Sequence, residues 1–511
     1  MRKVTLLLIL SSVLSVSLWH TTLLADNHMD QICEFEGEHP EDEFGKSMCC
    51  LDFNGDGLDD LLVGTPFYGV GGKIYFYLGG DDFGVGPSFT MTGDSDNLID
   101  VQIRNLGDLN NDGCDDLVVP NYNYTIGSFE FWILLGGTEP DTIPDYVYLP
   151  GGEPLSMLPR FNGIGDFNGD GYDDAGTHRD NKYYILWGGD TLELELFYTL
   201  EGEEHASNVT GVGDVNNDGY DDMEVGTGYN FQYRDLLFYG SSQPDTLYDV
   251  VLADTVYANF MGGRPAGDWN NDGYDDFYSN VGPSIGLWLG DEEISTQPDI
   301  YLEHEGIGFY GEYDYGNFNN NGYSDAAFGS PGWNYCDGRV HIVLGGTTIN
   351  GSTDLYIDAP EINNYFGNAI AVGDFNNDGF DDVAVGAPGT TMSPDSFPGE
   401  VYIYAGNDSL KEISVGVDDP DLPGGMTGTG LMRAYPNPFS SEIHFEINVR
   451  SLRELTIQIY NVKGQLIENV DVHDSDVTWN AGENASGSYF CKLMHKNEVL
   501  EVTKVTLVKH K

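Results

Sequence analysis

DFNGDGLDD, residues 52–60, decides the fold, because its pattern returns six more times along the chain. Five further copies are intact, at 108–116, 166–174, 214–222, 268–276 and 374–382, and a degraded copy at 317–325 reads NFNNNGYSD. Successive copies start 48 to 58 residues apart. A repeat of about fifty residues is typical of propellers and other repeat arrays.

Each copy offers oxygen ligands at positions 1, 3, 5 and 9 and a backbone carbonyl at position 7, a set that suits Ca²⁺. Cys and His, which Zn²⁺ prefers, are absent from the side-chain ligand positions. Glycine at position 6 allows the positive φ of a sharp turn. We therefore predict six calcium sites, with position 7 contributing its carbonyl, formed by Asp52, Asn54, Asp56, Leu58 and Asp60; Asp108, Asn110, Asp112, Cys114 and Asp116; Asp166, Asn168, Asp170, Tyr172 and Asp174; Asp214, Asn216, Asp218, Tyr220 and Asp222; Asp268, Asn270, Asp272, Tyr274 and Asp276; and Asp374, Asn376, Asp378, Phe380 and Asp382.

The degraded sixth loop is set apart from these six. Its corresponding side chains are Asn317, Asn319, Asn321 and Asp325, so a single carboxylate remains. Because calcium affinity depends on the number of charged ligands, occupancy of this seventh site is not expected to match the others.

Two alternatives for the loops are an EF-hand or dockerin motif and a simple hairpin turn. EF-hand loops need an acidic ligand at position 12 and flanking helices, whereas position 12 here holds Val63, Val119, Thr177, Val225, Ser279 and Val385 within β-like runs. A turn needs only two special residues, and six copies preserve six identities each. Calcium between two strands is therefore favoured.

Four strand-like segments recur in each unit. A short run ending in Gly-Asp precedes the loop, a second strand follows it, and an alternating third strand such as KIYFYLGG (73–80) ends in glycine. A fourth strand follows in six units, but the seventh unit lacks one, and QICEFEGE (31–38) stands unmatched before the first loop. We predict a seven-bladed propeller over residues 26–407, closed by pairing 31–38 with 400–405.

The N-terminal segment indicates export. Residues 1–25 have Arg2 and Lys3 before an apolar run and the small Ala25, as in a signal peptide. No later stretch approaches twenty apolar residues, so no transmembrane segment is expected after signal removal.

With 84 acidic against 21 basic residues and a net charge of −63, nucleic acid is excluded as a partner. The six cysteines show no regular spacing, and their pairing is left open.

Residues of about 30–407 resemble the FG-GAP repeats of the integrin α-subunit propeller. Phe44-Gly45 and Phe366-Gly367 match the FG element, 386–388 match the GAP element, and the nonapeptides match the calcium hairpins of that family. The middle units keep only fragments of these motifs. The resemblance implies an all-β, seven-bladed propeller that binds calcium.

A Pro/Gly/Asp-rich linker at 408–432 leads to alternating segments at 433–511, which predict a small β-sandwich. This tail resembles the type A sorting domain of the type IX secretion system, or the related flagellar-hook-cap-type immunoglobulin-like domain, through the motif at 435–439, Trp479, Gly487, Tyr489 and Lys504. The resemblance implies export machinery as a partner. The alternative is a sandwich that only extends the chain.

Two classes of function remain open. The first is a noncatalytic adhesion or ligand-binding module at the cell surface, whose partner is a protein or a glycan. The second is a secreted hydrolase or polysaccharide lyase, which would place Lys, Arg, His or Tyr side chains in the central funnel. With ten Lys and Arg over 26–432, no such cluster is apparent in the sequence, and no catalytic motif occurs. The first class is therefore favoured, with no catalytic residue assigned.

Overall fold

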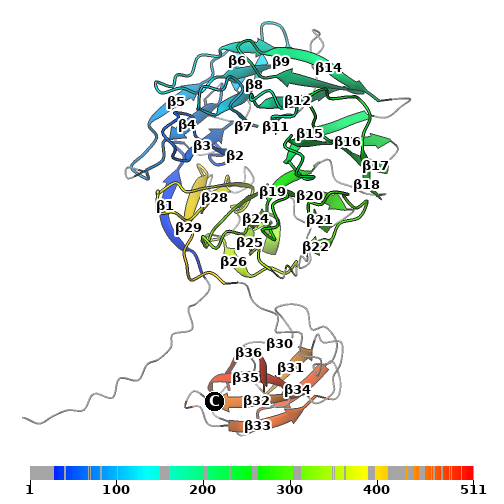
Figure 1. The fold of residues 1–511 in the computed structure, drawn as a ribbon. Coiled ribbons are helices and arrows are strands. Elements are labelled where there is room, and N and C mark those ends of the chain that lie inside the picture. The colour runs from blue at the N-terminus through cyan, green and yellow to red at the C-terminus, as the bar shows by residue number, and fades with distance from the viewer. Residues whose placement is uncertain are drawn as a thin grey trace, which may run out of the picture.

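The protein forms a closed ring of seven antiparallel sheets, the blades (Figure 1). The inner strands of the ring line a central channel. The computed structural model describes residues 28–411 and 432–509, with short gaps of which the longest are 150–159, 256–262, 303–311, 390–396 and 448–454. The predicted signal peptide and most of the predicted linker lie outside the described residues. The all-β, seven-bladed prediction is confirmed.

Each blade runs from an inner strand beside the channel to an outer strand at the rim, and neighbouring inner strands contact one another around the ring. The first three blades are β2 (Ser47–Leu51), β3 (Asp60–Thr65), β4 (Lys73–Tyr77) and β5 (Phe89–Thr92); β7 (Arg104–Gly107), β8 (Asp116–Asn123), β9 (Ser128–Leu134) and β10 (Tyr146–Tyr148), with β6 (Asn97–Ile99) also on β8; and β11 (Phe161–Gly165), β12 (Asp174–Arg179), β13 (Lys182–Trp187) and β14 (Glu193–Thr199).

The next three blades repeat this order. They are β15 (His205–Gly213), β16 (Asp222–Tyr229), β17 (Gln232–Phe238) and β18 (Val250–Thr255); β19 (Arg264–Gly267), β20 (Asp276–Val281), β21 (Ser284–Trp288) and β22 (Ile300–Leu302); and β23 (Tyr313–Gly316), β24 (Asp325–Gly329), β25 (Arg339–Val343) and β26 (Leu355–Asp358). A single helical turn, α1 (Trp333–Cys336), joins β24 to β25.

The seventh blade is completed by the N-terminal strand, as the strand count predicts. It consists of β27 (Ala369–Gly373), β28 (Asp382–Ala387), β29 (Glu400–Ala405) and β1 (Asp30–Glu36). Strand β1 pairs antiparallel with β29, with Cys33 opposite Ile403 and Phe35 opposite Val401. Phe35 also stacks on Tyr77 of the first blade, with ring centroids 4.1 Å apart. The seam thus joins both ends of the propeller.

Burial explains the sequence of the second strands. Strands β3 and β28 are buried at every position, because blades cover them on both faces, and such strands read as near-continuous apolar runs. Outer strands such as β14 alternate between exposed and half-buried residues. The apolar clusters form between adjacent blades, so Phe44 and Leu61 of the first blade pack with Ala384 of the seventh.

The tail is a β-sandwich, as predicted. One sheet holds β30 (Met432–Tyr435), β31 (Glu442–Ile447) and β34 (Asp476–Asn480), and the other holds β33 (Leu466–Asp471), β32 (Leu455–Asn461), β35 (Gly487–His495) and β36 (Glu498–Leu507). Both sheets bury residues in one apolar cluster around Trp479 and Phe439.

The six cysteines are all unpaired, which settles the pairing that the sequence left open. Trp288 is buried and stacks on Phe277. Trp333 is half-buried and lies beneath the guanidinium of Arg339, whose Cζ is 4.3 Å from the ring centroid. Within the described residues, no helix is long and apolar enough to cross a membrane.

Candidate metal centre and central channel

The loop backbone gathers side-chain oxygens at its exposed tip. In the first loop, Asp52 Oδ1 and Asn54 Oδ1 both accept the N–H of Asp56, at 3.1 and 2.9 Å. Asp52 Oδ2 accepts the N–H of Gly57 at 2.8 Å, and Asp56 Oδ1 accepts that of Leu58 at 3.0 Å. The second to fifth loops repeat all four contacts. The oxygens of positions 1, 3 and 5 therefore lie together in these five loops. In the loop at 374–382, Asp374 and Asp378 keep their contacts, but Asn376 Nδ2 donates to the carboxylate of Asp382 instead.

Position 9 lies on the inner side of the loop. Asp60 is fully buried, and its two oxygens accept the N–H groups of Phe53 and Gly79, at 3.1 and 2.8 Å. Burial raises the pKa of Asp60 to about 7 and that of Asp116 to about 8. The fourth predicted ligand thus also fixes the loop to the end of the third strand.

The donor set fits a hard cation. Two oxygens at predicted ligand positions, Asp174 Oδ2 and Asn376 Oδ1, are buried without a hydrogen-bond partner in the described part of the chain. A carboxylate oxygen that accepts one N–H keeps a second lone pair. Over the described residues, no three His, Cys, Asp or Glu side chains form a metal cluster. Since position 3 is Asn, the tip of each of the six intact loops carries only two acidic side chains, and an amide and a carbonyl would supply the other oxygens to a cation.

Positions 4 and 6 are both left-handed, and the sequence analysis recognised only the second. Position 6 has φ between +82° and +93° in all seven loops. Position 4 also has positive φ, from +52° to +73°, and is always Gly or Asn. These are the residues that adopt this conformation at least cost. The Gly/Asn restriction at position 4 was the available signal.

Position 8 joins neighbouring blades, a role that sequence reasoning missed. The carboxylate of Asp115 accepts the N–H of Asp52, which is position 1 of the preceding blade, at 3.1 Å. The same bond, from the N–H of position 1 to the carboxylate of position 8 in the next blade, forms at five more junctions. The donor and acceptor pairs are Asp108 and Asp173, Asp166 and Asp221, Asp214 and Asp275, Asn317 and Asp381, and Asp374 and Asp59. The last of these bonds spans the seam between the first and seventh blades.

The sixth loop departs from this ring. Ser324 stands at position 8, and only its backbone N–H bonds to Asp268 of the fifth blade, at 3.0 Å. Its tip keeps the fold of the other loops, since Asn317 Oδ1 and Asn319 Oδ1 accept the N–H of Asn321. The degraded loop has therefore kept its turn while losing charge.

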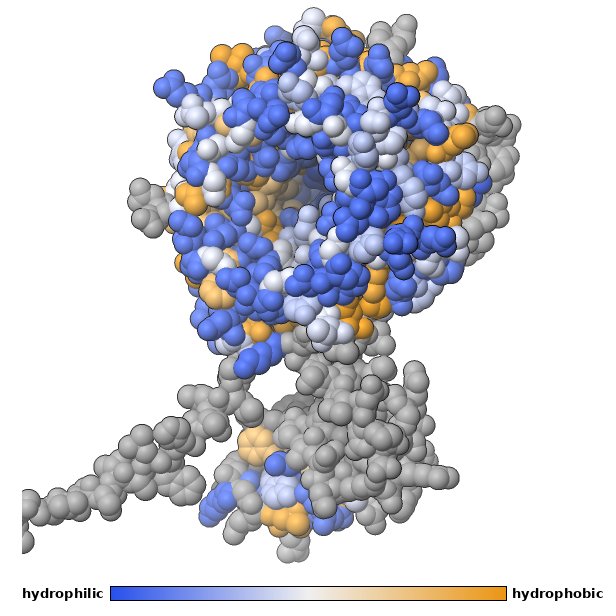
Figure 2. Space-filling model, viewed as in Figure 1, coloured by the Kyte–Doolittle hydropathy of each residue, from blue (hydrophilic) through white to orange (hydrophobic). Residues whose placement is uncertain are grey.

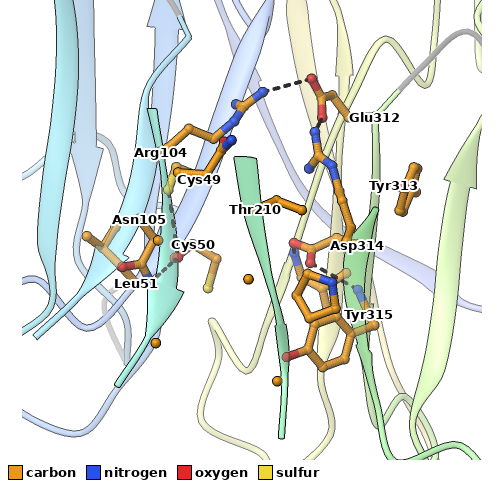
Figure 3. A pocket seen from close by; sticks show the side chains of 18 of the residues that line it. Cys49, Cys50, Leu51, Arg104, Asn105, Thr210, Glu312, Tyr313, Asp314 and Tyr315 are labelled. Carbon is orange, nitrogen blue, oxygen red and sulfur yellow. Dashed lines mark hydrogen bonds and ion pairs between the residues drawn. The ribbon is translucent and has the colours of Figure 1, made fainter. Parts of the chain in front are cut away.

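The channel wall corrects one expectation from the sequence. Arg104, Arg160 and Arg264, three of the ten basic residues of 26–432, line a channel cavity of about 660 Å³. Figure 3 shows Arg104 bonded to Glu312 across the channel, with Tyr313 and Asp314 beside it. A basic and aromatic cluster therefore exists in the funnel, assembled from blades too far apart in sequence for a local pattern to reveal it.

Ion pairs and burial shift the pKa values of the acidic groups at this end of the channel. Burial alone would raise the pKa of Glu312, but Arg264, Arg104 and Arg160 lower it to about 2. Glu312 Oε1 accepts Arg104 Nη2 at 3.0 Å, and Oε2 accepts Arg264 Nη2. Burial raises the pKa of Asp314 to about 6 and also raises the pKa of Tyr313. The ion pairs thus lower the pKa of Glu312, whereas burial raises the pKa values of its two neighbours.

Family models match both parts of the chain. The FG-GAP repeat matches residues 44–77 and 366–404, the first and seventh blades on either side of the seam, and the secretion system C-terminal sorting domain matches 433–509. Two of the seven blades therefore carry FG-GAP repeat sequence, and the propeller is similar to that of the integrin α-subunits. The chain carries a type IX secretion sorting domain, and it is exported to the cell surface or the extracellular space.

The chain matches only a small part of the length of its curated relatives. Integrin alpha-5 of Xenopus laevis is 31% identical over 20% of this chain and 11% of its own, and integrin alpha-7 of Homo sapiens is 38% identical over 16% and 8%. Phosphatidylinositol-glycan-specific phospholipase D of Bos taurus is 29% identical over 27% and 19%. Among solved structures, BBS1N in complex with ARL6DN has a TM-score of 0.45 at 9% identity, covering 74% of this chain and 97% of its own. PorZ of the Porphyromonas gingivalis type IX system has 0.41 at 13%, covering 93% and 60%.

Proposed function

We propose that the exported propeller binds calcium at six loops and serves as a noncatalytic adhesion or ligand-binding module for a protein or glycan. The observation that carries this proposal is the repeated loop tip, in which the oxygens of positions 1, 3 and 5 are held together by the loop's own N–H groups. Such preorganisation reduces the ordering needed when a cation binds. The acidic excess of the chain also favours cation uptake.

Calcium would stabilise the folded ring by mass action. With a Kd of about 0.1 mM and about 1 mM free calcium, each loop contributes roughly 1.4 kcal/mol. Elemental analysis of the full chain should then give about six calcium ions, and a chelator should lower the melting temperature. A melting curve that a chelator leaves unchanged, or fewer than four bound ions, would contradict the assignment.

A pair of matched variants tests which loops bind. Replacing Asp108 and Asp112 by Ala in the intact second loop should remove one ion. Replacing Asn317 and Asn321 by Ala in the sixth loop should leave the count unchanged, because that tip has no carboxylate at positions 1 and 5. Equal losses from both variants would contradict the ligand assignment.

The channel cluster gives the alternative, a hydrolase or lyase, a place for its chemistry. Arginines and tyrosines line the funnel, but burial raises the pKa values of both Tyr313 and Tyr315. A general base works best with a pKa near the operating pH, so these two tyrosines are poor candidates, whereas Asp314, with a pKa of about 6, comes closer to this condition. A glycan and protein array probed with the calcium-loaded protein, followed by a hydrolysis assay on each hit, separates the two classes. Turnover of a hit would contradict the noncatalytic proposal.

A further inference from the structure

Three guanidinium groups, those of Arg104, Arg160 and Arg264, line the end of the channel where the inner strands begin. Both oxygens of Glu312 are engaged, one by Arg104 and one by Arg264. Arg160 lines the same cavity, and its side chain makes no hydrogen bond or ion pair with any described residue. Asp314 adds a second carboxylate here, and its oxygens accept the N–H groups of Tyr315 and Val372. Among the described residues at this end, three guanidinium groups therefore face two carboxylates, which leaves surplus positive charge.

This surplus is costly without a ligand. An arginine stays protonated in proteins, so it cannot escape burial by losing its charge. Burial lowers the pKa of Arg160, Glu312 opposes this, and the positive charges of Arg104 and Arg264 add to it. A half-buried guanidinium that has no partner among the described residues gains most from an anion that presents two oxygens to its planar fork.

We propose that this end of the channel binds an oxyanion, a sulfate or carboxylate group, with Arg160 as the principal ligand and Arg104 and Arg264 adding charge. The hydroxyl of Thr210 lines the same cavity and has no partner among the described residues, so it supplies a neutral donor (Figure 3). A cavity of about 660 Å³ has the size of small-molecule sites. An acidic sugar residue or a free inorganic anion would satisfy the same chemistry.

The opposite end of the cavity sets the direction of binding. It is lined by loop carboxylates at position 8, namely Asp59, Asp115, Asp221, Asp275 and Asp381. These groups repel an anion, so the oxyanion belongs at the arginine end, with any neutral part of the molecule extending along the channel. Figure 2 shows that the ring is hollowed at its centre on the face in view. The proposal requires neither calcium nor adhesion.

Calorimetric titration of the full chain with sodium sulfate and with sodium glucuronate, at ionic strength held constant by sodium chloride, tests this site. We expect saturable binding of at least one of the two, and the preferred anion distinguishes an inorganic ligand from an acidic sugar. Arg160→Gln should weaken binding at least tenfold. The control Arg179→Gln removes an arginine that pairs with Asp180 outside the channel and should leave affinity unchanged.

A third variant tests the direction of the charge effect. Glu312→Gln removes the competing carboxylate and should tighten anion binding, which a purely structural role for Arg160 would not produce. The proposal is overturned if neither anion binds the wild-type chain. It is equally overturned if Arg160→Gln and Arg179→Gln bind alike. Calcium counting is independent of both results, so failure here is distinguishable from failure of the calcium proposal.

Discussion

At the scale of single residues, backbone conformation restricts the residue types of the loop as much as the predicted ligand chemistry does. Two of the nine positions, 4 and 6, are left-handed, and Gly or Asn occupies position 4 in every copy. The side chain at position 2, as in Phe53 and Trp269, is fully buried. Repetition of the motif along the chain therefore has a structural cause even at positions that are not predicted calcium ligands.

Gly113→Ala tests this conformational requirement. Gly113 has φ +88° and open space around its Cα, so the substitution introduces backbone strain without a clash. We expect a loss of about 1 kcal/mol in the free energy of unfolding, measured by urea denaturation in chelator. Gly137→Ala, in the same blade, also meets open space but has no left-handed φ. This control should be neutral, and an equal loss from both substitutions would contradict the strain argument.

Glu312 should give the propeller a distinctive acid dependence. Its pKa in the folded protein is about 2, below the ordinary value of 4.5. A depressed carboxyl pKa stabilises the folded state above the ordinary pKa, and this contribution is lost as the pH falls towards 2. The advantage of wild type over Glu312→Gln in unfolding free energy should thus be full above about pH 4.5 and shrink in acid. A difference that is constant with pH would contradict this pairing.

At the scale of elements, hydrogen bonds between loops link the blades into a ring. Position 8 of one loop accepts the first N–H of the preceding loop at six of the seven junctions, the exception being Ser324. The glycine before position 1 belongs to the same contact. A Cβ at Gly165 would lie 2.2 Å from Asp221 Oδ2.

Asp221→Ser should measure this junction, because serine is the residue that the sixth loop already carries at position 8. The substitution leaves the N–H of Asp166 without its charged acceptor, which lies at 2.8 Å. We expect a loss of about 1 to 3 kcal/mol in unfolding free energy. Asp190→Ser, at an exposed position, is the matched control and should be neutral. Indistinguishable denaturation curves would argue against a stabilising ring.

The N-terminal strand is the second device of closure. Deleting residues 26–38 should expose the edge of β29 and remove Phe35 from its stack on Tyr77, so we expect a large loss of stability or aggregation. Deleting thirteen residues of the 408–432 linker is the control of equal length. Similar thermal melts for the two deletions would contradict the structural importance of the seam.

At the scale of the whole molecule, the propeller and the tail each have a hydrophobic core of their own. We therefore expect residues 26–410 to fold and bind calcium without the tail. In the native host, deletion of 433–511 should retain the protein in the periplasm, as shown by cell fractionation and surface labelling. Unaltered surface display after that deletion would contradict the sorting role.

The sequence by itself determined what is local and repeated. The loop pattern recurs within each blade, so its turn, its strands, the number of blades and even the donor of the missing strand could be read by counting, and the structure confirms them. The convergence of positions 1, 3 and 5 also follows from one short segment, because the N–H groups that gather their oxygens lie within that segment.

Only the tertiary structure decided what lies at the ring's axis and between its blades. Arg104, Arg264 and Glu312 come from three blades and meet because closure brings all the inner strands to one channel. The role of the acid at position 8 follows only from the tertiary structure, because the N–H group that it accepts belongs to the preceding blade. Arg104 and Glu312 are 208 residues apart in the sequence, so no local sequence pattern indicates that these side chains meet in the closed ring.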